Sequence, residues 1–224
     1  MKKMKKLALV LVCTMMVCML GGCGASFDAS AYTKALLDNS YKNDSAAFVE
    51  MKIGTAEEAA ALYEQGLDAE MAAIVTGSGM ELSEEQETAY RALFADILAS
   101  VKYTVGEAVK QDDGSFVVTV TYEQLNIFGP AMEAYMTRVT TLAEEWMSAA
   151  LLGEATPSED EMMDVIIMEL ATCLEEALAA ATYDEPATAT VRIELVDRVY
   201  TPNEQDIANL EMVMFDLDAM EEVE

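Results

Sequence analysis

The sequence predicts a helix-rich α+β fold with one small antiparallel sheet, and three features of the pattern lead to this prediction. Several stretches repeat apolar residues at helical spacing, and two of them begin with the capping boxes Thr55-Ala-Glu-Glu58 and Ser83-Glu-Glu-Gln86. Two neighbouring stretches, 102–109 and 115–125, alternate apolar and polar residues around Gln111-Asp-Asp-Gly114, which is typical of a β-hairpin. A later alternating stretch, 187–200, predicts a third strand with one face in water.

The helices follow from apolar spacing and from their start signals. They are predicted over about 28–48, 55–77, 83–98, 129–153, 156–181 and 201–217. DNSYKNDS is a weak point that could divide the first helix. Thr156-Pro-Ser-Glu159 and Thr201-Pro-Asn-Glu204 are near copies, and in each we expect the Thr as N-cap and the Pro at the first helical position.

Together these elements give the order ααα-ββ-αα-β-α with about three strands. A sheet this small needs helices on its apolar face, so we expect a single α+β domain over residues 30–224. Division into two parts near residue 129 or 154 is the alternative.

The N-terminus, residues 1–22, is typical of a secretory signal. MKKMKK is followed by the apolar run LALVLVCTMMVCML and then by small residues. The apolar run is short for a spanning helix, which needs roughly 20 residues. A permanent membrane helix and a plain secreted protein with a chance cysteine are the alternatives.

Leu20-Gly21-Gly22-Cys23 resembles the lipobox of bacterial lipoproteins. The resemblance implies cleavage after Gly22 and a covalent diacylglycerol on the Cys23 thiol, which would anchor the protein on the outer face of the cell membrane. Two acyl chains anchor stably where one does not. The linker 23–29 that follows is short, about 25 Å if extended, so the folded part is expected close to the membrane.

The chain is strongly acidic, with a formal net charge of −28. Cleavage would remove Lys2, Lys3, Lys5 and Lys6 and no acid, leaving −32. Nucleic acid is excluded as a partner because no basic patch could neutralise phosphates. Cationic partners or divalent ions are favoured electrostatically, although solubility alone also accounts for the charge.

Motifs of common enzyme classes are missing. The chain contains no histidine, so Ser-His-Asp and Cys-His arrangements are excluded. Nucleophile-elbow, P-loop and dinucleotide-binding motifs are also absent from the sequence. We therefore expect no cofactor and a non-enzymatic protein. Glycoside hydrolysis needs only two carboxylates, so a carboxylate-based enzyme of the cell envelope, such as a glycan hydrolase, is the alternative.

Two acidic clusters are weak candidates for a divalent cation such as calcium. The first comprises Glu159, Asp160, Glu161 and Asp164, and the second comprises Asp216, Asp218, Glu221 and Glu222. The EF-hand pattern is absent. Acids in a first helical turn also suit the helix dipole, which explains 159–161 without a metal.

Methionine, tryptophan and cysteine each allow a structural and a functional interpretation. The twelve methionines after the leader lie mostly at helical spacing, which favours core filling. Alternatively they form an adaptable groove for peptides or apolar ligands. Trp146 and Cys173 lie in apolar helical patterns, so both are predicted to pack in the core.

From residue 28 onward the chain resembles the small uncharacterised extracytoplasmic lipoproteins of Gram-positive bacteria. The resemblance rests on YTKALLDNSYKND, YRALFADILASVKYTVGEAVKQDDGSFVVTVTYEQL and VRIELVDRVY. It implies a fold type and no activity. The leading hypothesis is a lipid-anchored binding or scaffolding module of the cell envelope, with a protein or peptide partner met through a helix–sheet groove or an acidic helix face.

Overall fold

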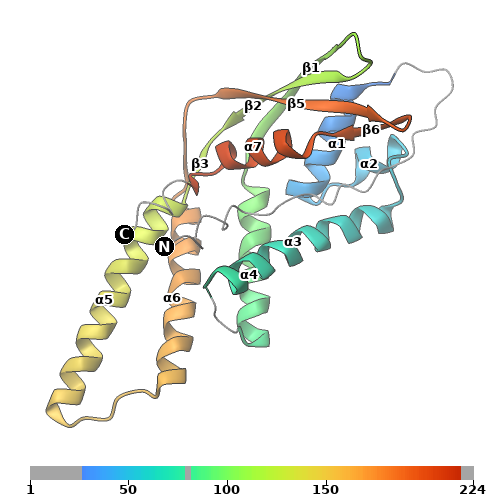
Figure 1. Cartoon of the computed structure of the whole chain (residues 1–224). Helices are drawn as coiled ribbons and strands as arrows, with labels where there is room; N and C mark the ends of the chain where they lie inside the picture. Colours follow the sequence, from blue (N-terminus) through green and yellow to red (C-terminus); the bar gives the residue numbers. More distant parts are fainter. Residues whose placement is uncertain (1–26, 79–81, 218–224) are drawn as a thin grey trace.

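The fold is helix-rich and is known from a computed structural model that describes residues 27–78 and 82–217. Its helices are α1 (Ala29–Lys42), α2 (Ala46–Glu50), α3 (Ala56–Ser78), α4 (Glu84–Ala99), α5 (Phe128–Leu152), α6 (Glu159–Ala179) and α7 (Glu204–Met214). Its strands are β1 (Lys102–Lys110), β2 (Phe116–Glu123), β3 (Leu125–Asn126), β4 (Thr182–Tyr183), β5 (Ala187–Val196) and β6 (Val199–Pro202). The predicted α+β class is confirmed (Figure 1).

The main sheet is antiparallel with the order β1-β2-β5-β6. The predicted hairpin forms β1 and β2, which pair from Lys102–Glu123 to Lys110–Phe116. Strand β5 adds to β2 across a long stretch of intervening sequence. Helices α1 and α7 lie against this sheet, and α3 and α4 pack on the side of α1 (Figure 1).

The prediction of about three strands is wrong, because the expected strand at 187–200 is a hairpin of β5 and β6. Its turn residues Asp197 and Arg198 both have positive φ, at 51° and 69°. Two such residues make the tight turn that matches the twist of paired strands. The turn was missed because Asp-Arg lacks the Gly or Asn that usually signals this backbone. Strands β3 and β4 also form a separate two-stranded sheet.

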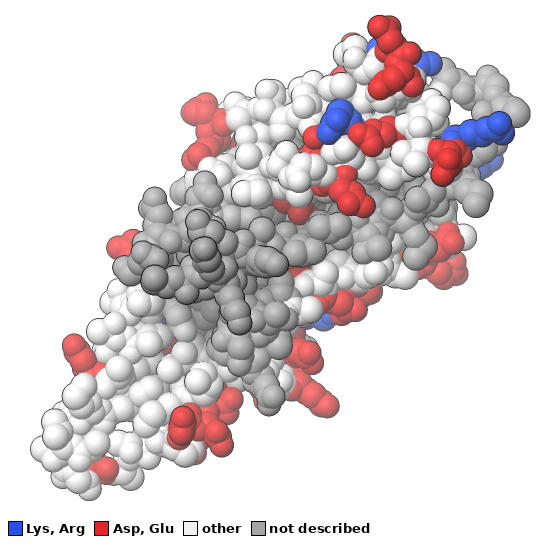
Figure 2. Space-filling model, in the orientation of Figure 1, with Lys and Arg blue, Asp and Glu red and all other residues white. Residues whose placement is uncertain are grey.

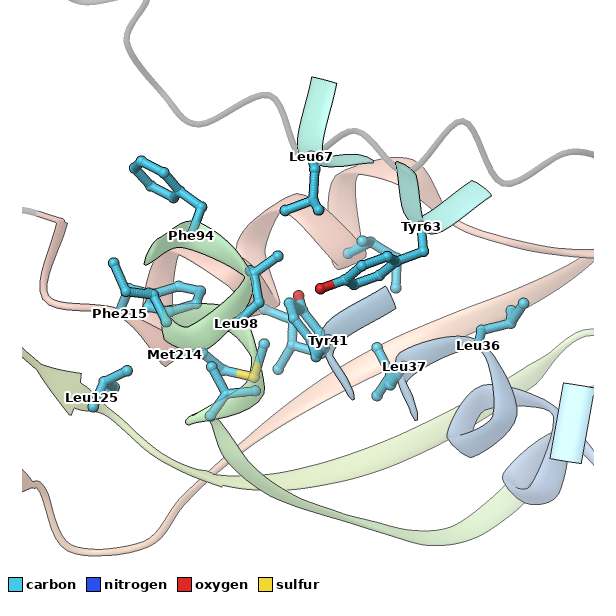
Figure 3. Packing of buried hydrophobic residues seen from close by; sticks show 14 of the residues in the cluster. Leu36, Leu37, Tyr41, Tyr63, Leu67, Phe94, Leu98, Leu125, Met214 and Phe215 are labelled. Atoms are coloured by element: carbon cyan, nitrogen blue, oxygen red, sulfur yellow. The ribbon is translucent and has the colours of Figure 1, made fainter. Parts of the chain in front are cut away.

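The core is one continuous cluster in the described residues that draws on the sheet and on all seven helices. Helix α1 supplies Leu36, Leu37 and Tyr41 to this cluster, and Tyr41 lies near Tyr63 of α3 and Leu98 of α4 (Figure 3). The predicted weak point in the first helix is a real break. Helix α1 ends at Lys42, and Asn43 after it adopts the left-handed conformation at φ 50°.

The helix starts are set by capping side chains. The predicted boxes at Thr55 and Ser83 are confirmed, since each side chain exchanges hydrogen bonds with the residue three positions later. The expected N-caps Thr156 and Thr201 are wrong, because Ser158 and Asn203 cap α6 and α7 instead. The later start places three acids in the first turn of α6, where the helix dipole favours negative charge.

Helices α5 and α6 form an antiparallel hairpin that projects from the rest of the molecule (Figure 1). Its base is held by Asp216, which follows α7. The Asp216 carboxylate accepts hydrogen bonds from the backbone N–H groups of Ile127, Phe128 and Gly129, at 3.1, 2.9 and 2.8 Å. These N–H groups start α5 and have no partner within the helix. The Asp216 side chain therefore ties the start of the hairpin to the C-terminal part of the domain.

Asp216→Asn is expected to lower the free energy of unfolding by about 1–3 kcal/mol. The amide is neutral, and its NH2 group cannot accept a hydrogen bond from a backbone N–H group. Chemical denaturation measures the change. Asp112→Asn, at an exposed position, is the matched control. Equal stability of both variants would show that the cap does not hold the hairpin.

Candidate functional site

The residues predicted for lipid attachment and cleavage, Leu20, Gly21, Gly22 and Cys23, lie outside the described residues. The lipobox therefore stays a prediction from sequence.

The predicted metal candidates lie at the start of α6, and two of the four already have structural partners. The Glu161 carboxylate accepts hydrogen bonds from Ser158 in the capping box, and Asp164 accepts one from Gln86 of α4 at 3.1 Å. Glu159 and Asp160 are exposed in the first turn. In the part of the chain that the structure describes, no three acidic or cysteine side chains are grouped so as to hold a metal ion. These residues therefore stay the weak candidates that the sequence offers, with no metal expected.

The second acidic cluster is described only at its first member. Asp216 uses both carboxylate oxygens to cap α5. Asp218, Glu221 and Glu222 lie outside the described residues.

Two acidic side chains are buried in the core, and sequence reasoning did not single them out. Glu70 of α3 and Glu211 of α7 are each only 1% exposed. The Tyr41 hydroxyl lies 3.3 Å from Glu211 Oε1 and donates to it. Both Glu70 carboxylate oxygens and Glu211 Oε2 have no hydrogen-bond partner. Buried acids normally require such partners, so this pair is a departure from ordinary core composition.

Burial raises the pKa of both carboxyl groups. The pKa of Glu70 rises from 4.5 to about 8 because desolvation disfavours the charged form. The pKa of Glu211 rises to about 9, first through desolvation and then through repulsion by Glu70, while the Tyr41 hydrogen bond lowers it. Both groups are therefore neutral acids at pH 7.

Two neighbouring acids with raised pKa values are the chemistry that a carboxylate-based hydrolase would need. Substrate has no access to these two carboxyl groups, because neither side chain reaches solvent in the described structure. A glycan chain could not contact them without opening of the core. The pair therefore affects stability, and it gives the hydrolase alternative no support.

The sequence does contain a signal for these acids. Glu70 follows Tyr63 and Leu67 at helical spacing, and Glu211 follows Ile207 in the same way. Both acids therefore interrupt apolar stripes, which is where a buried polar residue is expected.

A hollow of about 430 Å³ lies between α3 and α4. It is lined by Asp68, Met71, Ala72, Glu87, Thr88 and Arg91. Arg91 pairs with Glu64 and with Asp68, so its charge is already neutralised. This hollow differs from the predicted helix–sheet groove, because both of its walls are helices.

The α5–α6 hairpin exposes apolar side chains that the sequence pattern could equally have placed in a core. Met136, Met147 and Leu151 of α5 are 45%, 61% and 82% exposed. Met163 and Met168 of α6 are exposed as well. Core filling by these four methionines is therefore excluded, and an adaptable apolar surface is favoured.

Inside the hairpin, the two helices pack through a second, half-buried stripe. Trp146 lies on this stripe and is only half-buried, so the prediction that it packs in the core is wrong. Arg138 crosses from α5 to pair with Glu169 and Glu176 of α6. The prediction that Cys173 is buried is confirmed, and burial raises the pKa of its thiol. A raised pKa leaves little reactive thiolate.

No helix in the described ranges has both the length and the hydrophobicity to span a bilayer. The sequence matches no protein-family model and no curated protein. The fold is similar to that of a candidate lipoprotein, YcdA of Bacillus subtilis, whose crystal structure superposes with a TM-score of 0.54 at 13% identity. The match covers 84% of this chain and 56% of the B. subtilis chain. At this identity the likeness shows a shared fold.

Replacing a buried acid should change how stability depends on pH. A pKa above the unfolded value means that folding takes up protons, so stability is greatest below about pH 4.5 and falls as pH rises toward 8–9. The limiting slope is about 1.4 kcal/mol per pH unit for each group. Glu70→Met should raise the melting temperature at pH 8 and reduce the difference between pH 5 and pH 8.

Thermal melts at pH 5, 6.5 and 8 check this prediction. Glu57→Met, at an exposed position of the same helix, is the control and should keep the wild-type slope. Parallel pH profiles for wild type and Glu70→Met would mean that Glu70 is not a buried neutral acid.

Proposed function

We propose that this protein is a non-enzymatic binding module, held on the outer face of the cell membrane by a diacylglycerol on Cys23. The lipobox supports the anchor, and the shared fold with a candidate lipoprotein agrees with it. The observation that carries the binding role is the exposed apolar surface of the α5–α6 hairpin. Soluble proteins seldom leave such surface on a projecting element unless it meets a partner.

The charge pattern and the missing motifs favour binding over catalysis. The sequence has no histidine and none of the nucleophile or phosphate-binding motifs, and the buried acid pair is closed to substrate. The exposed methionines are flexible and polarisable, so they adapt to partner surfaces of different shape.

The anchor is tested by the intact mass of the protein from the membrane fraction, beside a Cys23→Ala variant. We expect a mature mass that begins at Cys23 and includes a diacylglyceryl group, and release of the variant from the membrane. An uncleaved chain would indicate a helical membrane anchor, and an unmodified secreted chain would refute the lipoprotein proposal.

The binding role is tested separately by a photo-crosslinking residue at position 147 in living cells. The matched control is position 212 of α7, where methionine is 49% exposed. The proposal expects an adduct of defined mass from position 147 alone. Equal labelling at both positions, or none, would contradict a role for the hairpin.

A further inference from the structure

The exposed side of α5 has the spacing of a helix-packing surface. Successive intervals of 4, 3, 4 and 4 residues place five side chains along one line of this helix: Met136, Thr140, Ala143, Met147 and Leu151. All five are exposed. The Thr140 hydroxyl donates to the Met136 carbonyl at 2.8 Å, so its proton is already bonded within the helix. We call these five residues the open stripe.

The open stripe is distinct from the surface that α5 uses against α6. That packed surface includes Tyr135, Val139, Leu142 and Trp146, which are half-buried. Residues 146 and 147 are about 100° apart around a helix, so the two stripes are neighbours and not opposites. Among the described helices, α5 packs mainly against α6, so its open stripe is an apolar side with no neighbouring helix in the part of the chain that the structure describes. The open stripe extends about 22 Å, the length of a helix of about 15 residues.

The charge of the hairpin restricts the kind of helix that could bind there. Between residues 128 and 179 the sequence has eleven acids and one base, Arg138. Arg138 is already paired with two of the acids. The hairpin end shows red and white surface and no blue on the face seen in Figure 2. Glu133 and Glu144 are exposed, lie eleven residues apart, and border the open stripe.

We propose that the open stripe binds a basic amphipathic helix, with its apolar side on Met136, Met147 and Leu151 and its lysines or arginines facing Glu133 and Glu144. This inference rests on the proposed binding function and names its partner class. Helix-in-groove binding uses anchors at this spacing. A second copy would bring another hairpin with a net charge of −10 against the first, and anionic lipid headgroups would be repelled in the same way.

The test uses the mature chain, residues 23–224, with Cys23→Ala, and a labelled 15-residue peptide of leucine and lysine patterned as an amphipathic helix. Anisotropy of the label gives the dissociation constant. Trp146, the single tryptophan of the chain, reports binding beside the open stripe. We expect saturable binding with a shift in Trp146 emission. A peptide with glutamate for lysine, and one with its leucines scattered, should not bind.

Variants then locate the binding surface. Met147→Lys with Leu151→Lys should weaken binding by about tenfold or more, while Met212→Lys on α7 should leave it unchanged. Glu133→Gln with Glu144→Gln should weaken binding and reduce its salt dependence, while Glu107→Gln with Glu185→Gln should not. The altered side chains are exposed, so the fold is expected to persist.

Several outcomes would overturn the inference. Peptide binding that leaves Trp146 emission unchanged, or that survives Met147→Lys with Leu151→Lys, would place the site elsewhere. Self-association or vesicle binding lost in that variant would assign the open stripe to a second copy or to lipid. If the peptide fails while crosslinking at position 147 succeeds in cells, the partner class is wrong and the binding function stands. If both fail, the binding function fails as well.

Discussion

The place where the α5–α6 hairpin leaves the domain depends on the hydrogen bonds from three backbone N–H groups to Asp216. Phe215 reinforces this point, because its ring contacts Phe128 and its backbone bridges to Leu125. The chain enters the hairpin at residue 128 and is fixed there by residues almost ninety positions later. The direction of α5 is therefore set by the C-terminal segment as well as by its own packing.

Two departures from ordinary burial occur in separate parts of the domain. Outside the α5–α6 hairpin, the core contains two acids, Glu70 and Glu211, where apolar side chains are usual. The hairpin exposes apolar side chains where charged ones are usual. The acids make the core sensitive to pH, since they are tolerated only as neutral groups. The exposed stripe makes the hairpin available for contact. The two features share no side chain, so they can be altered independently.

Local signals predicted most of the fold. The helices, two capping boxes and the first hairpin could be predicted because each depends on residues within a few positions of one another. The pairing of β2 with β5 could not be predicted, because it joins segments about seventy residues apart. The turn at Asp197-Arg198 was not predicted, because it lacks the Asn-Gly or Asp-Gly pair that usually indicates positive φ at both positions. For α6, two overlapping capping patterns, at Thr156 and Ser158, fit equally well.

The exposed apolar side of α5 could be predicted only in part, because the sequence does not show which helix faces are covered. Helical spacing shows that Met136 and Met147 share a side of α5, but it cannot show whether a neighbouring helix covers that side. Glu70 and Glu211 were more accessible to sequence reasoning, because each interrupts an apolar stripe. The place of Phe27 was not predicted either, and its stacking on Tyr200 fixes where the N-terminal end of the domain lies. Helix α1 begins at that end of the molecule, and the hairpin tip lies at the other (Figure 1). If Cys23 carries the proposed lipid, the four residues from Cys23 to Phe27 reach at most about 14 Å. The sheet end of the domain would then face the membrane. The tip of the α5–α6 hairpin would then be the part of the domain farthest from the bilayer.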